Sequence, residues 1–95
     1  MNSLKELLDK IHKDIQSSDL IKEYPEYSDR KMIGYELESI ALDIMPNYIP
    51  EDKKEEFINE CEENYNETTF KKYVKDYSLF LDEVEKKFYD GLKEE

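Results

Sequence analysis

Apolar residues recur at helical spacing in four stretches of the chain, and this spacing predicts four amphipathic helices. In the first stretch, the apolar positions are Leu4, Leu7, Leu8, Ile11 and Ile15, which share one face of a helix. Ser3 and Glu6 have the spacing of a capping box, in which each side chain accepts a hydrogen bond from a free backbone amide of the first turn. We therefore expect a first helix over residues 4–16.

Prolines and polar residues separate the other three stretches. Ser28 can cap a second helix over residues 28–45, which ends because Pro46 follows. Pro50 suits the first turn of a third helix over residues 51–64, because its missing N–H is not needed there. The last apolar stripe runs without interruption from Phe70 to Leu92 and predicts one long helix over residues 67–92.

Each apolar stripe must be covered by the others, so the sequence predicts an all-α fold, a small four-helix bundle-like single domain over residues 1–95. A chain of this length is too short for a second core. Two glycines and three prolines are also few for the many turns of a β-sandwich. The residues expected in the core are Leu8, Ile11, Leu37, Ile40, Ile44, Phe57, Phe70, Val74, Leu81 and Phe88.

The formal net charge of −11 is concentrated in the middle of the chain. Residues 18–45 hold seven acids and three bases, and residues 51–67 hold eight acids and two bases. The two ends of the chain are close to neutral. Such a field repels phosphate backbones and anionic lipid, so it disfavours nucleic-acid binding and membrane attachment and favours a basic partner.

The third predicted helix carries a row of acids on the side opposite its apolar face. The candidate partner-binding acids in and beside this row are Asp52, Glu55, Glu56, Glu60 and Glu63. Like charges one turn apart weaken a helix by some tenths of a kcal/mol per pair, so the stability of the helix does not explain the row. Two interpretations stay open, a solvated face that keeps the protein soluble and a docking surface that steers a basic macromolecule.

Eight tyrosines are more than a small helical core needs, because a buried phenol must find a hydrogen-bond partner. Tyr24 and Tyr27 lie in a loop that contains Pro25, where partial exposure is expected. Tyrosine beside carboxylate is a composition typical of interface centres. Tyr24 and Tyr27 are therefore candidate anchors for a partner, or else simply edge the core.

No residue pattern indicates catalysis, so we expect a protein that is not an enzyme and needs no cofactor or metal. His12 is the single histidine, and Cys61 is the single cysteine and lies on an apolar face without a histidine to activate it. One cysteine excludes an internal disulfide framework and suits a reducing compartment. Because the first residues lack an apolar stretch, we expect a cytoplasmic protein without a membrane-inserted segment.

Residues 19–25, Asp-Leu-Ile-Lys-Glu-Tyr-Pro, resemble the aspartate-leucine-isoleucine-tyrosine-tyrosine-proline segment of nuclease-colicin immunity proteins. They depart from it by one inserted residue, by Lys22 and Glu23 in place of one tyrosine, and by following one predicted helix rather than two. More generally, the chain resembles the small acidic helical immunity proteins that neutralise colicins and contact-dependent toxins. The resemblance implies that Asp19 and Tyr24 contact a basic toxin domain, typically a nuclease.

The leading hypothesis is therefore an immunity protein or inhibitor that binds a basic toxin domain through an acidic surface. Three alternatives remain open. The chain could be a phage-type nucleic-acid mimic that inhibits restriction or CRISPR enzymes, or a bacteriocin immunity protein that acts at the membrane. It could also be an adaptor module without inhibitory activity.

Overall fold

The computed structural model describes residues 1–93, and every regular element in that range is helical. The α-helices are α1 (Leu4–Gln16), α2 (Leu20–Glu23), α3 (Arg30–Ile44), α4 (Lys54–Glu63), α5 (Glu67–Tyr73) and α6 (Tyr77–Lys93). Three short 3-10 helices connect them: η1 (Pro25–Ser28), η2 (Met45–Tyr48) and η3 (Glu51–Lys53). The predicted all-α class is confirmed.

The first three predicted helices are present, and their caps differ in detail from those expected. Ser3 accepts the hydrogen bond from the amide of Glu6 at 3.1 Å, as predicted, but the Glu6 carboxylate accepts from Asn2 rather than from Ser3. The helix predicted from residue 28 begins at Arg30, because Asp29 rather than Ser28 caps it. The acceptor side chain lies one residue later, and the helix shortens accordingly.

The prediction of one long helix over residues 67–92 is wrong, because the chain turns between α5 and α6. Val74 is extended, and Asp76 has a φ of 50°, a left-handed conformation that aspartate tolerates better than most residues. The amide of Lys75 donates to the carbonyl of Tyr48 at 2.9 Å, which fixes the turn against η2. The apolar spacing continues across the turn, so periodicity alone gives no sign of it.

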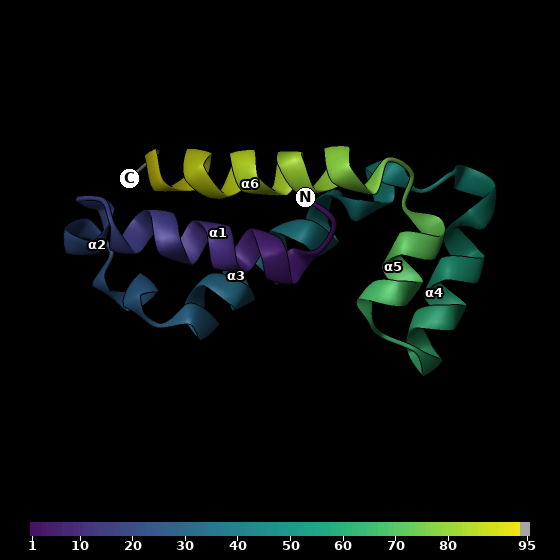
Figure 1. Cartoon of the computed structure of the whole chain (residues 1–95). Helices are drawn as coiled ribbons and strands as arrows, with labels where there is room; N and C mark the ends of the chain where they lie inside the picture. Colours follow the sequence, from purple (N-terminus) through teal and green to yellow (C-terminus); the bar gives the residue numbers. More distant parts are fainter. Residues whose placement is uncertain (94–95) are drawn as a thin grey trace.

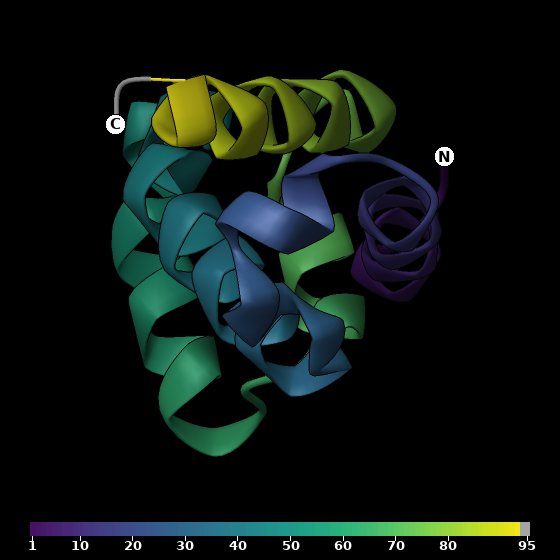
Figure 2. The same cartoon turned by 90° about the vertical axis from the view of Figure 1, so that its left-hand side faces the viewer.

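The molecule has two parts, a body of three long helices and a hairpin of two shorter ones. Helices α1, α3 and α6 pack together and form the body, with the short α2 at one end (Figure 1). Helices α4 and α5 pack against each other and project from the opposite end, across the direction of α6 (Figure 1). The view along the body shows α6 lying across α1 and α3 (Figure 2). The long dimension of the molecule is 44 Å.

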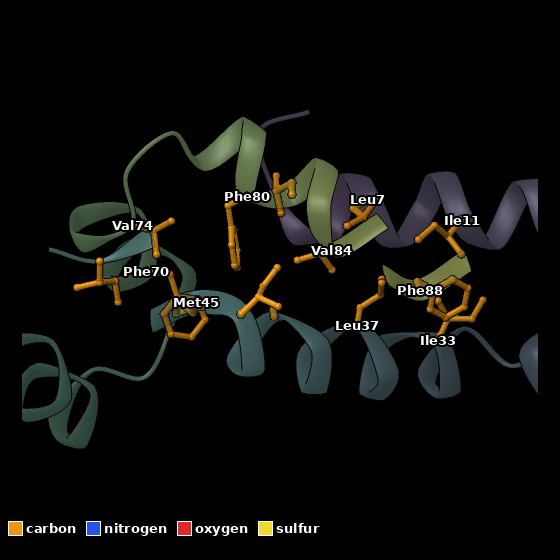
Figure 3. Packing of buried hydrophobic residues seen from close by; sticks show 14 of the residues in the cluster. Leu7, Ile11, Ile33, Leu37, Met45, Phe70, Val74, Phe80, Val84 and Phe88 are labelled. Atoms are coloured by element: carbon orange, nitrogen blue, oxygen red, sulfur yellow. The ribbon is translucent and has the colours of Figure 1, made fainter. Parts of the chain in front are cut away.

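The core lies between the three helices of the body and continues under the hairpin (Figure 3). Its buried apolar residues are Leu7, Ile11, Ile15, Ile33, Leu37, Ala41, Ile44, Met45, Ile49, Phe70, Val74, Phe80, Leu81, Val84 and Phe88. Seven of the ten expected core residues are in this group, whereas Leu8, Ile40 and Phe57 are only partly buried and pack against its edge. For Phe57 the reason is that α4 packs mainly on α5 and has no fully buried residue of its own.

One carboxylate ties the hairpin to the body. Glu67, the first residue of α5, accepts hydrogen bonds from the amide of Leu4 at 2.7 Å and from the hydroxyl of Tyr77 at 2.6 Å. The amide of Leu4 is one of the free donors at the start of α1, so the contact also places a negative charge at the positive end of that helix. Glu67 thus joins the starts of α1, α5 and α6.

We expect Leu81→Ala to lower the free energy of unfolding by about 2–5 kcal/mol, because its side chain is fully buried. Leu79→Ala is the matched control, since Leu79 lies on the same helix but is 57% exposed. Its loss should stay below about 0.5 kcal/mol. Urea denaturation followed by circular dichroism measures both values, and similar losses at the two positions would show that the packed face of α6 is assigned wrongly.

We expect Glu67→Ala to lower the free energy of unfolding by about 1–3 kcal/mol, because two donors lose a charged acceptor. Glu63→Ala removes the same charge from an exposed side chain and serves as the control. Denaturation of the two variants at equal ionic strength separates the contact from general charge repulsion. Equal stabilities would mean that Glu67 does not hold the hairpin.

Candidate protein-binding surface

The acids of η3 and α4 divide into paired and unpaired groups. Glu51 lies 2.7 Å from the ammonium of Lys54, and Glu56 lies 3.6 Å from that of Lys53. Both pairs join residues three positions apart and are largely exposed, so each adds little stability. The two lysines do offset the negative charges of Glu51 and Glu56. Glu56 therefore attracts a basic partner less strongly than an unpaired carboxylate would.

Glu60 connects α4 to α5 and is not part of the open face. One of its carboxylate oxygens lies 2.7 Å from the ammonium of Lys72 and accepts a hydrogen bond from the hydroxyl of Tyr73 at 3.2 Å. The bond from Lys72 lowers the pKa of Glu60, although partial burial acts in the opposite direction. Glu60 is thus engaged in a contact of the hairpin, and its role in steering a partner stays a prediction.

The unpaired acids form what we call the acidic surface, made up of Asp52, Glu55, Glu62 and Glu63. All four are exposed, and within residues 1–93 none has an ion pair or a side-chain hydrogen bond. Glu55 and Glu62 lie two turns apart on one line of α4, while Asp52 precedes the helix and Glu63 ends it. Sequence reasoning missed Glu62, although its distance of seven residues from Glu55 indicates the same line.

An exposed apolar side chain lies within the acidic surface. Ile58 is 58% exposed and lies three residues after Glu55 and four before Glu62, so it neighbours both on the helix. In such an arrangement the apolar side chain can be buried against a partner, and the neighbouring carboxylates attract a cationic one. The sequence pattern does not distinguish Ile58 from the apolar residues of α4 that pack on α5. Its exposure depends on which side of α4 is covered by α5.

Tyr65 lies just beyond the C-terminal end of α4 and is held in a fixed position. Its ring packs edge-on against Phe70 with centroids 5.4 Å apart, and its hydroxyl donates to Glu38 of α3 at 2.9 Å. Partial burial and the Glu38 carboxylate raise the pKa of Tyr65 to about 12. With half of its surface exposed, Tyr65 extends the surface from α4 toward α3.

The other predicted binding residues lie at the opposite end of the molecule. Asp19 and Tyr24 flank α2, which lies far from α4 along the long axis (Figure 1). Tyr24 donates its hydroxyl to the carbonyl of Leu92 at 2.6 Å and stacks on Tyr27, which in turn packs on Phe88 with ring centroids 5.4 Å apart. The fold therefore does not bring the two predicted groups onto one surface.

The single cysteine, Cys61, and the single histidine, His12, each lie in a contact between parts of the fold. Burial raises the pKa of the Cys61 thiol, and the charge of Glu60 raises it further, so the reactive thiolate is disfavoured. The ring of His12 is 3.3 Å from the carbonyl of Ser28 and joins α1 to η1. In the described part of the chain, no three or more His, Cys, Asp or Glu residues are grouped so as to hold a metal ion.

The helices of residues 1–93 are too short or too polar for any of them to cross a membrane. No protein-family model, curated protein or solved structure matches the chain. The fold and the surface define a small all-α protein with unpaired acids on one projecting helix.

Proposed function

We propose that this protein is an inhibitor of the immunity type, which binds a basic protein, such as a toxin nuclease domain, through the acidic surface of α4. The observation that carries the proposal is the set of four exposed and unpaired carboxylates of the acidic surface, two of which, Glu55 and Glu62, neighbour the exposed Ile58. The surface acts by occupying the region of the partner that would contact phosphate. Such an inhibitor needs no catalytic group, metal or cofactor of its own.

Electrostatics supports a basic partner. The neighbouring carboxylates of α4 repel one another, and within residues 1–93 no lysine or arginine pairs with the four of the acidic surface. A partner that supplies lysine or arginine removes this repulsion on binding and is attracted over several ångströms before contact. Complementary charge of this kind mainly raises the association rate, which suits an inhibitor that must capture a toxin in the cytoplasm before the toxin reaches its substrate.

The apolar side chain adds to this argument. Leu79 is exposed to the same extent, but Ile58 differs from it in lying beside two carboxylates of the acidic surface, and interface centres combine an apolar anchor with surrounding charge. Ile58 provides the anchor, and Tyr65, just beyond the end of the same helix, provides an aromatic ring held against Phe70. The surface thus has separate groups for fast association and for slow dissociation.

The charge prediction is tested on the partner captured by the full-length chain from cells that encode it. We expect the triple variant Glu55→Lys, Glu62→Lys and Glu63→Lys to associate with this partner at least roughly tenfold more slowly at low salt. The salt dependence of its association rate should also flatten. Stopped-flow fluorescence over a range of salt concentrations measures both effects.

The control is the triple variant Asp43→Lys, Asp82→Lys and Asp90→Lys, which changes the net charge equally at exposed positions on α3 and α6. It should retain most of the wild-type association rate. An equal loss in both triple variants would show that only the total charge matters. Capture of a restriction or CRISPR enzyme would favour the nucleic-acid mimic over the toxin inhibitor.

The anchor prediction concerns the dissociation rate. We expect Ile58→Ser to raise the dissociation rate of the same complex by roughly five- to thirtyfold, because an interface centre loses its apolar contact. Leu79→Ser is the matched control, since Leu79 is exposed to nearly the same extent on α6. Surface plasmon resonance measures both rates, and unchanged dissociation in the Ile58 variant would place the binding centre elsewhere.

A further inference from the structure

Helix α3 carries apolar residues on two opposite sides. One side packs on α1 and α6 (Figure 2). The buried residues of that side are Ile33, Leu37, Ala41 and Ile44. The opposite side faces solvent and carries Met32, Tyr35 and Leu42, which are 42%, 65% and 42% exposed. An apolar side of a helix is normally covered by another element, so the outer side of α3 lacks a cover within the single chain.

The exposed apolar residues of α3 lie along one line. Tyr35 follows Met32 by three positions and precedes Leu42 by seven, so all three share one side of the helix. Three of the six large apolar side chains that are exposed in residues 1–93 are on this line, so they are not scattered singly. We call this line, with the exposed residues beside it, the α3 face, which consists of Lys31, Met32, Tyr35, Ser39, Leu42 and Asp43.

The two ends of the α3 face carry opposite charges. Lys31 lies in the first turn of α3 and Asp43 in the last. Within residues 1–93 neither side chain has an ion pair. A uniformly basic partner is repelled by Lys31, whereas a fitting partner has an acid near Lys31 and a base near Asp43. A second copy of α3 that runs in the opposite direction meets both requirements.

The α3 face is also symmetric about the level of residue 37. On either side of this level lie Met32 and Leu42 at five residues, Tyr35 and Ser39 at two, and Lys31 and Asp43 at six. In an antiparallel pair centred there, the large ring of Tyr35 is level with the small side chain of Ser39 in the second copy. A dimer with two-fold symmetry requires such reciprocal positions, because residue i of one copy meets residue j of the other and j meets i.

We propose that the α3 face is the contact between two copies of this chain, whose α3 helices pair antiparallel about a two-fold axis. The centre of the contact buries Met32, Tyr35 and Leu42. At each end, Lys31 of one copy lies near Asp43 of the other. No residue of the acidic surface belongs to the α3 face, so this proposal is independent of the function proposed above.

The size of the α3 face limits the strength of the dimer. With 15 residues, α3 is about 22 Å long. Two crossed helices of this length bury less than the roughly 1,200–2,000 Å² of a standard stable interface. Each copy also has a net charge of −11, so the copies repel one another at low salt. We therefore expect a dissociation constant in the micromolar range and a monomer at nanomolar concentration.

The test measures self-association of the full chain without any partner. Sedimentation equilibrium between about 10 µM and about 1 mM should show monomer and dimer in a concentration-dependent equilibrium. Over the same range, the amide signals that shift in nuclear magnetic resonance spectra should map to residues 31–43. Raising sodium chloride from about 0.05 M to about 0.5 M should lower the dissociation constant at least roughly threefold, because salt screens the repulsion between the copies.

A matched pair of variants shows whether the apolar centre makes the contact. We expect Tyr35→Ser to raise the dissociation constant of the dimer at least roughly fivefold. Leu79→Ser is the control, because Leu79 is exposed to a similar extent on α6, and it should leave the dimer unchanged. Both side chains face solvent in the single chain, so both variants should keep the circular dichroism spectrum of the wild type.

A charge exchange tests the antiparallel orientation. Lys31→Asp should raise the dissociation constant at least roughly threefold, and Asp43→Lys in the same chain should restore it, because opposite charges again meet at both ends. Lys31→Asp with Asp82→Lys is the control, since it restores the net charge at an exposed position on α6. It should not restore the dimer. In a parallel pair neither second substitution would restore it.

A chain that stays monomeric at about 1 mM would overturn the proposal. The same holds if Tyr35→Ser dimerises as the wild type does, if the shifts map to α4 or α6, if salt weakens the dimer, or if the charge exchange fails to restore it. The association rates that test the acidic surface are measured on the monomer at nanomolar concentration. Failure of one proposal is therefore distinguishable from failure of the other.

Discussion

The position of α4 depends on the contacts that hold α5, because α4 itself buries no residue completely. Glu67 fixes the start of α5 to the starts of α1 and α6, and the amide of Lys75 fixes the turn after α5 to η2. Helix α4 then packs on α5 through Phe57, which lies against Phe70 and Tyr73. This chain of contacts presents most of α4 to solvent and so makes its outer side available to a partner.

The same contacts decide which acids remain available. In a chain with a net charge of −11, a carboxylate stabilises the fold only where it pairs with a cation, accepts a hydrogen bond from a hydroxyl or lies at the N-terminus of a helix. Glu60 and Glu67 are used in this way, and Tyr48 likewise donates to Glu83. The acids of the outer side of α4 have no such use, and this difference distinguishes a candidate binding surface from a merely acidic segment.

The acidic surface and the predicted binding residues Asp19 and Tyr24 lie at opposite ends of a molecule whose long dimension is 44 Å (Figure 1). The acidic surface follows one side of a projecting helix and suits long-range attraction over a broad area. A partner that contacted both groups would have to extend along most of the body.

The sequence by itself determined the all-α class, most helix boundaries and most of the core, because helical spacing, caps and prolines are local signals. It also located the excess of acids between residues 51 and 67. It did not reveal the turn at Val74 to Asp76, since the apolar spacing is the same on both sides of it.

Only the tertiary structure decided which acids are unpaired, that Glu60 belongs to the α4–α5 contact, and that Ile58 lies exposed among carboxylates. It also placed Tyr24 and Tyr27 at the end of the body far from α4, where Tyr27 packs on Phe88. The physical reason is that pairing and exposure depend on neighbours distant in the sequence. One row of residues can face solvent or another helix without any change in its own pattern.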